Sequence, residues 1–406
     1  MTGTKMRPIR ETIPIERALE LADTVAQPLT RTESIDLADG VGRVLAVAVV
    51  ADKDVPPFNR AAMDGYAVVA ENTFGASRID PRRLEYLETV HTGGVPSRVV
   101  ESGHCTQIAT GAPMPDGADA VVMVEETDRN GDQVSVFTPV YPRQHVGRRG
   151  ADITSGTPLL QPGDVLTPSR LGSIAALGIA DIEVYARPRI AILSTGNEIV
   201  GPGLPLGPGQ IYDINRFTLG AVIREHGGIP FPFPTTADSL DELNATVDAC
   251  LENDVLVFSG GSSVGERDLT LDVLRARGEV LFHGIAVKPG KPTVLGTIEG
   301  TPVLGMPGYP TSCLSNAYML LVPMLRRLAR LPAYQFRTTR VPASQRFVST
   351  TGRHQFYTVR VLDGKAVPAF KASGDITSMS QADGYIEIPA QTDIVEEGEI
   401  VEVKLF

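Results

Sequence analysis

Two patterns of apolar and polar positions alternate along residues 188–332. Short β-rich apolar runs are typical of buried strands, and the stretches between them repeat apolar residues at helical spacing. Strands that alternate with helices predict a doubly wound α/β domain with a parallel sheet. The predicted strands are 190–193, 229–233, 255–258, 280–282, 293–295 and 303–304, and the predicted helices are 217–225, 240–251, a segment from 269 onward, and 313–329.

Different patterns flank this segment on both sides. Residues 11–30 and 170–178 have helical spacing, 33–50 have strand character, and 66–140 consist of short β runs separated by Gly, Pro and Asp. We therefore predict a multidomain α/β and β protein. Its parts are an N-terminal mixed domain (1–50 and 141–187), an inserted β domain (51–140), the central doubly wound domain (188–332) and a C-terminal small β-barrel (333–406).

Composition and charge narrow the possible functions. The chain has 406 residues and a formal net charge of −11, which argues against nucleic-acid binding and against a cationic membrane surface. The three cysteines are widely spaced, which is typical of a reduced chain without a disulfide framework. Neither an apolar leader nor an apolar run of 18 residues occurs, so we expect a cytoplasmic protein with no membrane partner.

The strand at 255–258 runs directly into a polar loop, Ser259-Gly-Gly-Ser-Ser-Val-Gly-Glu-Arg-Asp268. Glycines let backbone N–H groups turn toward a ligand, and the serines add hydroxyl donors. Glu266 and Asp268 place carboxylates at the end of the loop. A loop of this kind at the carboxyl end of a strand suits a phosphate and its metal ion.

Three further polar loops follow predicted strands of the same sheet, and we expect them at the same edge. Ser194-Thr-Gly-Asn-Glu198 offers hydroxyls and a carboxylate, and Val287-Lys-Pro-Gly-Lys-Pro292 offers Lys288 and Lys291. Gly305-Met-Pro-Gly-Tyr-Pro-Thr-Ser312 opens onto the last predicted helix, whose first N–H groups favour an anion. Together the four loops predict one site.

Simpler readings remain open for individual members. Glu198, Glu266 and Asp268 fit helix N-terminal capping, and Lys288 and Lys291 fit a solvated turn. Cys313 is expected to be a small buried residue at a helix start, and His283 a core or edge histidine.

A serine hydrolase is an alternative, because Gly261-Ser-Ser-Val-Gly265 matches the GxSxG pattern with Ser263 as nucleophile. That pattern needs the serine on a sharp turn between a strand and a helix. Ser263 instead lies five residues beyond Phe258 and precedes Gly-Glu-Arg-Asp, so the hydrolase reading is disfavoured.

Seven motifs, taken together and in order, resemble the MoeA family of molybdenum cofactor biosynthesis, which includes the gephyrin E domain. They are Ala62-Met-Asp-Gly-Tyr-Ala67, Ala109-Thr-Gly-Ala-Pro-Met-Pro115, Ser194-Thr-Gly-Asn-Glu198, Ile211-Tyr-Asp-Ile-Asn215, Ser259 to Asp268, Lys288-Pro-Gly-Lys-Pro292 and Met306-Pro-Gly-Tyr-Pro-Thr-Ser312. The resemblance covers almost the whole chain from about residue 10.

The resemblance implies a homodimer whose central domain is like the MogA adenylyltransferase. The implied reaction is insertion of molybdate into adenylylated molybdopterin, with release of AMP and a requirement for Mg²⁺. The implied catalytic residues are Asp64, Thr110, Asp152, Glu198 and Asp268, of which Glu198 and Asp268 would hold the metal, while Asp64, Thr110 and Asp152 would reach the site from the partner subunit. The implied substrate-binding residues are Ser194, Thr195, Gly196, Asn215, Gly260, Gly261, Ser262, Ser263, Lys288, Lys291, Pro307, Gly308, Ser312, Arg360 and Ser373.

The sequence departs from the common family pattern at four positions. Gly284 stands where many members have lysine, Tyr309 replaces a frequent Asn, Ala237 replaces the first Asp of a usual pair, and Thr358 occupies a position often held by Arg. These departures leave the ligands of the molybdate oxyanion open.

Two other functions are alternatives to the molybdenum transfer. The adenylyltransferase of the preceding step would not require residues 1–185, and a gephyrin-like receptor scaffold is not supported by any appended basic or Pro-rich linker. A MogA-like adenylyltransferase and molybdoenzyme apoproteins are the protein partners that the resemblance suggests.

Overall fold

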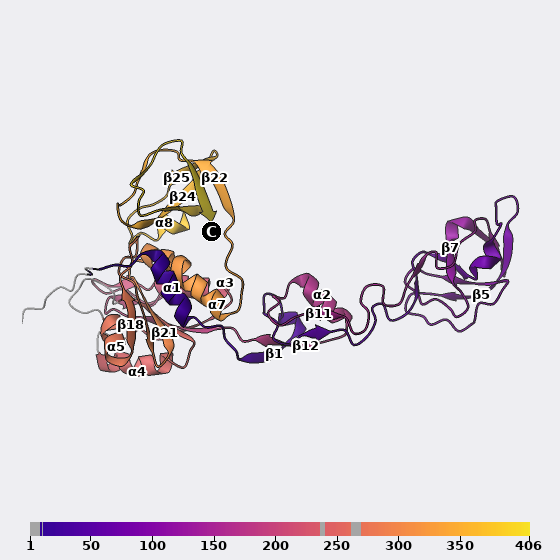
Figure 1. Cartoon of the computed structure of the whole chain (residues 1–406), viewed down its shortest axis with the longest axis horizontal. Coiled ribbons are helices and arrows are strands. Elements are labelled where there is room, and N and C mark those ends of the chain that lie inside the picture. Colours follow the sequence, from indigo (N-terminus) through magenta and orange to yellow (C-terminus); the bar gives the residue numbers. More distant parts are fainter. Residues whose placement is uncertain (1–8, 10, 236–239, 261–268) are drawn as a thin grey trace, which may run out of the picture. The chain divides into compact units, whose positions relative to one another are not determined.

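The computed structural model describes residue 9 and residues 11–235, 240–260 and 269–406. The chain forms two compact units (Figure 1). One comprises Gly42–Val44, Val184–Phe406 and the described residues up to Glu33; the other comprises Ser34–Val41 and Leu45–Glu183. Each unit is described by itself below.

A six-stranded sheet forms the centre of the first unit, in the order β16-β13-β17-β21-β20-β18. The bounds are β13 (Arg189–Ser194), β16 (Ile229–Pro232), β17 (Val255–Ser259), β18 (Glu279–His283), β20 (Val294–Ile298) and β21 (Thr301–Met306). Strands β16, β13, β17 and β21 pair in parallel, which confirms the expected parallel core of the sheet.

One strand runs against the others, so the expectation of a wholly parallel sheet was wrong at β20. This strand pairs antiparallel with both β21 and β18. Only Glu299 and Gly300 connect β20 to β21, both with positive φ (52° and 83°). A two-residue turn of this kind reverses the chain and can join only antiparallel neighbours.

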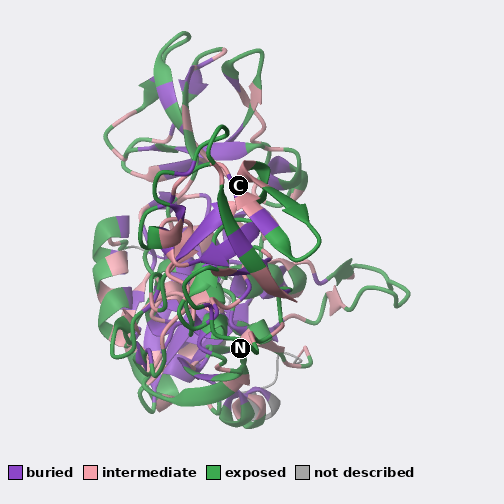
Figure 2. Cartoon of the chain, turned by 90° about the vertical axis from the view of Figure 1, so that its right-hand side faces the viewer, coloured by how far each residue is buried: buried purple, intermediate pink, exposed green. Residues whose placement is uncertain are grey.

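Helices cover both faces of the sheet, as the doubly wound prediction required (Figure 1). Residues of β13 and β17 alternate between two core clusters: Ile190 and Ile192 pack with helices α1, α3 and α7, whereas Ala191 and Leu193 pack with α4 and α5. Every residue of β17, and every residue of β13 except Arg189, is buried. Figure 2 colours the chain by burial and shows its long loops largely exposed. The helix bounds are α1 (Ile15–Val25), α3 (Asn215–Glu225), α4 (Leu240–Cys250), α5 (Leu269–Arg277), α6 (Pro310–Asn316) and α7 (Val322–Leu328).

The last predicted helix, 313–329, is interrupted. A π-helical turn, Ala317–Leu321, separates α6 from α7. Pro323 lies in the first turn of α7 and has no N–H to donate to the preceding turn, which accounts for the widened backbone just before it.

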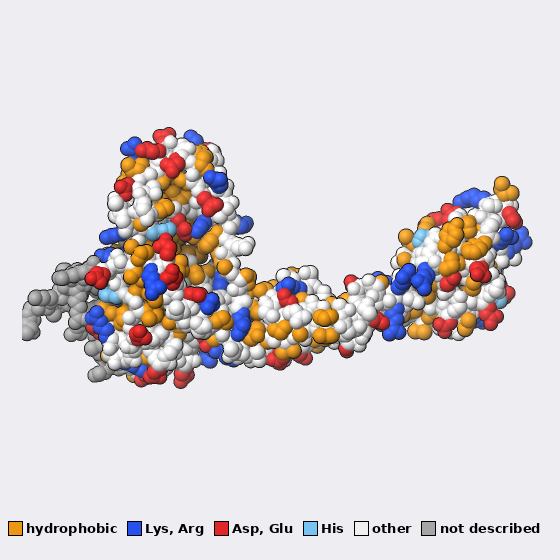
Figure 3. Space-filling view, viewed as in Figure 1, with side chains coloured by type: hydrophobic (Ala, Val, Ile, Leu, Met, Phe, Trp, Pro, Cys, Tyr) orange, Lys and Arg blue, Asp and Glu red, His pale blue; other side chains and the backbone are white. Residues whose placement is uncertain are grey.

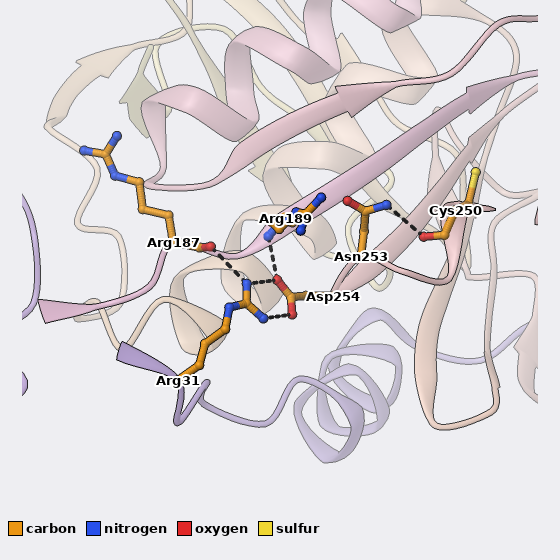
Figure 4. A network of polar contacts seen from close by, with 6 residues as sticks. All are labelled: Arg31, Arg187, Arg189, Cys250, Asn253 and Asp254. Atoms are coloured by element: carbon orange, nitrogen blue, oxygen red, sulfur yellow. Dashed lines mark hydrogen bonds and ion pairs between the residues drawn. The ribbon is translucent and has the colours of Figure 1, made fainter. Parts of the chain in front are cut away.

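The N-terminal segment is fixed to the sheet by Asp254, the residue just before β17 (Figure 4). Arg31 donates from both terminal guanidinium nitrogens to the Asp254 carboxylate, at 2.5 and 2.6 Å. The Arg189 N–H donates to the same carboxylate at 2.6 Å. Asp254 therefore joins the start of β17 to the start of β13 and to the segment that follows α1.

The C-terminal residues form a second sheet, β19-β24-β26-β28-β22, with β25 paired to β24. Its bounds are β19 (Val287–Lys288), β22 (Thr338–Pro342), β24 (His354–Leu362), β25 (Lys365–Pro368), β26 (Gly384–Ile388) and β28 (Ile400–Leu405); β23 (Phe347–Val348) pairs with β27 (Ile394–Val395), and α8 is Thr377–Ser380. Strand β19 comes from the predicted central segment and pairs in parallel with β24. The two sheets of this unit are thus joined at Val287 and Lys288.

The second unit contains a six-stranded sheet, β7-β4-β6-β5-β9-β8, that confirms the expected short strands. Between residues 66 and 140, all of which are described, the only helical segments are short 3₁₀ turns. The bounds are β4 (Gly65–Val68), β5 (Arg82–Val90), β6 (His104–Ile108), β7 (Ala120–Met123), β8 (Thr127–Asn130) and β9 (Gln133–Val136). The remaining elements between residues 32 and 185 are helix α2 (Pro168–Ala176) and three strand pairs. These are β2 (Val49–Val50) with β11 (Pro158–Leu160), β3 (Arg60–Ala61) with β10 (Val146–Gly147), and β1 (Thr32–Asp36) with β12 (Asp181–Tyr185). The exact domain boundaries remain predictions.

On the face drawn in Figure 3, basic and acidic side chains are interspersed rather than segregated. Among the described residues, no helix is both long and apolar enough to cross a membrane.

Candidate functional site

A cavity of about 1290 Å³ lies within the first unit, at the carboxyl edge of the central sheet. Loops after β13, β17 and β21 line it, together with the turn after β19 and parts of the C-terminal residues. Its lining includes most of the described residues predicted to bind substrate: Ser194, Thr195, Asn215, Gly260, Lys288, Lys291, Pro307, Gly308, Ser312 and Ser373.

Strand register explains why three of these loops meet. Ser194 is paired with Ser259, and Ser259 is paired with Met306, so the three strands end at the same level. Backbone bonds continue beyond the strands: Thr195 N donates to Ser259 O (3.1 Å), and Gly260 N donates to Met306 O (3.3 Å). The prediction that these loops share one edge is confirmed for the described residues.

The loop after β13 presents two buried hydroxyls to the cavity. Ser194 and Thr195 are 3% and 2% exposed, and neither hydroxyl has a hydrogen-bond partner among the described residues. Glu198, which also lines the cavity, is exposed. A Cβ at Gly196 would lie 2.7 Å from the Glu198 carboxylate oxygens, so this carboxylate folds back over the backbone of Gly196.

The segment between β15 (Ile211–Tyr212) and α3 adds a carboxylate that the sequence analysis missed. Asp213 is 5% exposed and lines the cavity beside Asn215. Its Oδ1 accepts a hydrogen bond from Arg216 N at 3.0 Å, while its Oδ2 is buried without a partner among the described residues. The motif Ile211-Tyr-Asp-Ile-Asn215 was the available signal, because an Asp two residues before a helix points into the same edge as the helix N-terminus.

The loop before α6 closes the cavity from another side. Gly308 O accepts a hydrogen bond from Asn215 Nδ2 at 2.8 Å, which ties this loop to α3. Thr311 and Ser312 are buried at the start of α6, as expected for the beginning of the last helix. Thr311 N donates to Ser373 O (3.2 Å), so the loop also holds the C-terminal residues against the cavity.

The two lysines line the cavity, and each ammonium group already has one acceptor. Lys288 Nζ donates to Thr350 Oγ1 at 2.7 Å, and Lys291 Nζ donates to Ile9 O at 2.8 Å. An ammonium carries three donors, so each lysine keeps donors for an anion. The solvated-turn reading does not hold for them, because both are partly buried.

Other cations differ from the expected pattern. Arg360 is exposed on β24 and does not line the cavity, whereas Arg353 does. The departure at Gly284 also has a structural reason: its φ is +103°, and a Cβ there would lie 2.5 Å from Ile9 Cγ2. A lysine at this position would have to displace the N-terminal segment. Thr358 is fully buried on β24, so an arginine at its position would also be enclosed.

Three predicted catalytic residues lie in the second unit. Asp64 and Thr110 are brought together, since Thr110 N donates to Asp64 Oδ1 at 2.7 Å, and both residues are exposed. Asp152 is also exposed, with its N–H donating to Val55 O at 3.0 Å.

Several predicted residues lie outside the described part of the chain: Gly261, Ser262, Ser263, Glu266, Asp268 and Ala237. The predicted metal pair is therefore described only at Glu198. Among the described residues no group of three or more His, Cys, Asp or Glu side chains could hold a metal ion. A carboxylate at the cavity fits the oxygen ligands that Mg²⁺ prefers.

The cysteines are structural. Cys105, Cys250 and Cys313 are fully buried, and burial raises the pKa of each thiol to about 12. The expectation for Cys313 is confirmed. His283, at the end of β18, interacts with another group of the chain and lies in the sheet, as expected for a core or edge histidine.

Three family descriptions match successive parts of the chain. Residues 13–178 match "MoeA N-terminal region (domain I and II)", 191–327 match "Probable molybdopterin binding domain", and 340–406 match "MoeA C-terminal region (domain IV)".

Named relatives match over nearly the whole length. A Mycobacterium tuberculosis protein named molybdopterin molybdenumtransferase 2 is 35% identical over 378 residues, covering 90% of this chain and 92% of that protein. A Bacillus subtilis protein named molybdopterin molybdenumtransferase is 31% identical, covering 98% and 95%. A crystal structure of a Pyrococcus horikosii molybdopterin biosynthesis MoeA protein matches with a TM-score of 0.85 and 40% identity, covering 97% of this chain and 99% of that one. The chain therefore belongs to the MoeA family of molybdenum cofactor biosynthesis.

Proposed function

We propose that this protein is a molybdopterin molybdenumtransferase, which inserts molybdate into adenylylated molybdopterin and releases AMP. The observation that carries the proposal is the single cavity in which hydroxyls, backbone turns and two lysines meet at the carboxyl edge of a doubly wound sheet. Such an edge is where α/β domains bind nucleotide-like ligands. The volume of about 1290 Å³ is large enough for a substrate with both a pterin and a nucleotide.

Different parts of the cavity suit different parts of this substrate. Lys288 and Lys291 supply the local positive charge that an oxyanion or a pyrophosphate requires in a chain of net charge −11. Ser312 at the start of α6 and Ser373 add hydroxyl donors, and Arg353 replaces Arg360 as the arginine in reach of the cavity. Gly260 to Ser263 would cradle the pyrophosphate with backbone amides.

A divalent ion would be held by Glu198 and Asp268, and it would supply charge stabilisation at the phosphoryl oxygens. Molybdenum is a substrate here, and its soft ligands would be the dithiolene sulfurs of the pterin. The buried thiols of this chain are consistent with molybdenum being bound by the pterin sulfurs, because the raised pKa of the thiols keeps them protonated.

The reacting site would be completed by a second subunit of a cytoplasmic homodimer. Asp64 and Thr110 are exposed and joined to each other, which is the state expected of a polar pair that meets its ligand outside its own unit. Asp152 is exposed in the same unit. In this proposal these three residues face the cavity of the partner subunit.

The test is a product assay with purified protein, adenylylated molybdopterin, Mg²⁺ and molybdate. We expect AMP to be released only when molybdate is present and molybdopterin to gain molybdenum. Formation of adenylylated molybdopterin and pyrophosphate from ATP and free molybdopterin, without AMP release, would instead identify the adenylyltransferase step. The match of residues 13–178 to the MoeA N-terminal region favours the molybdenum-transfer step over that alternative. The relatives named molybdopterin molybdenumtransferase favour it over a receptor scaffold.

A further inference from the structure

Four buried polar atoms face the cavity without a protein partner among the described residues. They are Ser194 Oγ, Thr195 Oγ1, Asp213 Oδ2 and Asn215 Oδ1, on side chains that are each less than one-tenth exposed. A buried polar atom left unpaired costs about 1–3 kcal/mol, so such atoms in native proteins usually bind water or a ligand. Four of them on residues that line one cavity indicate a prepared binding position.

Two of the four atoms can only accept hydrogen bonds. Asn215 Nδ2 donates to the carbonyl of Gly308 at 2.8 Å, and a carbonyl cannot donate, so the free atom of this amide is its oxygen. Asp213 Oδ1 is held by Arg216 N at 3.0 Å, which leaves Oδ2 as the free carboxylate oxygen. The ligand at this position must therefore present hydrogen-bond donors, either N–H or O–H groups.

We propose that Asp213 and Asn215 bind the 2-amino-4-oxo edge of a pterin. That edge presents a 2-amino group beside a ring N–H, which matches the two free acceptors, whereas the amino group of adenine lies between ring nitrogens that accept. An oxyanion has no donors and would be repelled here, so molybdate and phosphate belong at the lysine side of the cavity. This inference rests on the proposed function, which makes a pterin part of the substrate.

The surroundings suit a flat heteroaromatic ring. Leu206, Ile211 and Ile214 line the cavity next to Asp213 and offer apolar contact to the ring faces. The backbone that carries the carboxylate is fixed in advance: Asp213 N donates to Val200 O at 2.9 Å, and β14 (Ile199–Val200) pairs in parallel with β15 (Ile211–Tyr212). The backbone of Asp213 thus needs no rearrangement for its carboxylate to accept a hydrogen bond from the ring edge.

The test compares two soluble probes, 6-hydroxymethylpterin and 6-hydroxymethyllumazine, which differ in carrying a 2-amino or a 2-oxo group. Binding to the full-length protein is measured by calorimetry without nucleotide or molybdate. We expect the wild type to bind the pterin at least ~10-fold more tightly, because the 2-oxo group would face acceptors. Asp213→Asn keeps an oxygen for Arg216 N and replaces the other by an N–H donor, so its preference should reverse toward the lumazine.

Asp248→Asn is the matched control, since it makes the same change on an exposed residue paired with Arg277. It should keep the wild-type preference. Equal affinity of the wild type for the two probes, no measurable binding of either, or an unchanged preference in folded Asp213→Asn overturns the inference; the wild-type comparison stands even if the variant does not fold. AMP release without a preference for the pterin would leave the proposed function intact and overturn this inference. A preference for the pterin without AMP release would support this inference and overturn the proposed function.

Discussion

At the residue scale, Asp64 is a proposed catalytic residue whose chemical role can be tested by a substitution that keeps its hydrogen bond within the fold. Its Oδ1 accepts from Thr110 N at 2.7 Å and its side chain is exposed. Asp64→Asn keeps an oxygen for that bond but removes the carboxylate. We expect AMP release to fall by at least about 100-fold, the lower range for loss of an acid–base or charge-stabilising group.

The control is Asp80→Asn, the same change at a 75% exposed side chain of the same unit. It should retain wild-type turnover. Unchanged AMP release in Asp64→Asn, with the same unfolding curve as the wild type, would remove Asp64 from the site.

His226 gives a prediction about stability at the same scale. It caps the end of α3, is 1% exposed and packs edge-on against Tyr334, with neither ring nitrogen paired among the described residues. Burial, with the positive charge of Arg326, lowers its pKa from 6.5 to about 4. The unfolded chain therefore binds a proton between pH 6.5 and 4 that the folded chain does not bind, so stability is lost as pH falls through this window.

From these two pKa values the free energy of unfolding should fall by about 2 kcal/mol between pH 7.5 and pH 5 on account of this group. Urea unfolding at the two pH values measures it. His226→Phe has no group to protonate, so its loss over the same interval should be smaller by that amount. An equal loss in wild type and variant would contradict the assignment.

At the scale of helices and strands, the buried strands could be predicted from the sequence, but which strands pair with one another could not. The apolar runs at 190–193 and 255–258 are unbroken, because helices cover both faces of β13 and β17, and such runs identify strands without their neighbours. The reversal at β20 depends on Glu299 and Gly300, a turn that the apolar pattern does not register. The pairing of β19 with β24 joins residues far apart in the chain through only two residue pairs, too short for any periodicity.

The same contrast holds for the site. Loops that follow buried strands were predictable because parallel strands end at one edge, and Ser194, Gly260 and Ser312 do meet there. Arg360 was expected from the family resemblance, but the cavity is lined by Arg353, which directly precedes β24. The motif 211–215 placed Asp213 before a helix, but only the structure shows that its carboxylate is buried with one oxygen unpaired among the described residues.

The loop after β17 yields a prediction about backbone shape. Gly260 has φ +97°, and a Cβ there would lie 2.5 Å from the carbonyl oxygen of Thr195. Gly260→Ala must therefore move the ends of β13 and β17 apart, since both the dihedral and the contact are unfavourable. We expect a loss of more than about 1 kcal/mol in the free energy of unfolding and loss of AMP release.

Gly201→Ala is the matched control in the same unit, because a Cβ at Gly201 meets nothing within 4 Å and its φ is not positive. Its stability should stay within about 0.5 kcal/mol of wild type. Equal stability and turnover of Gly260→Ala and Gly201→Ala would show that the loop does not need the observed backbone conformation.

At the scale of the whole molecule, the proposed site draws on both compact units. Glu198 lies at the cavity of the first unit, and Asp64 lies on the second. If the two meet across a homodimer, each site takes one unit from each subunit. A twofold dimer then holds two such sites.

Mixed dimers distinguish this arrangement from a site within one subunit. Asp64→Asn and Glu198→Gln are each expected to be inactive alone, and co-expression with two different tags isolates the dimer that contains one of each. If sites form across subunits, one site of the mixed dimer combines an unchanged cavity with an unchanged Asp64, so AMP release should recover to about half the wild-type rate per dimer. If each site lies within one subunit, every site carries one substitution and no activity returns. Dimers of Asp64→Asn carrying both tags, purified in the same way, show that recovery does not come from the tags or from contaminating host enzyme.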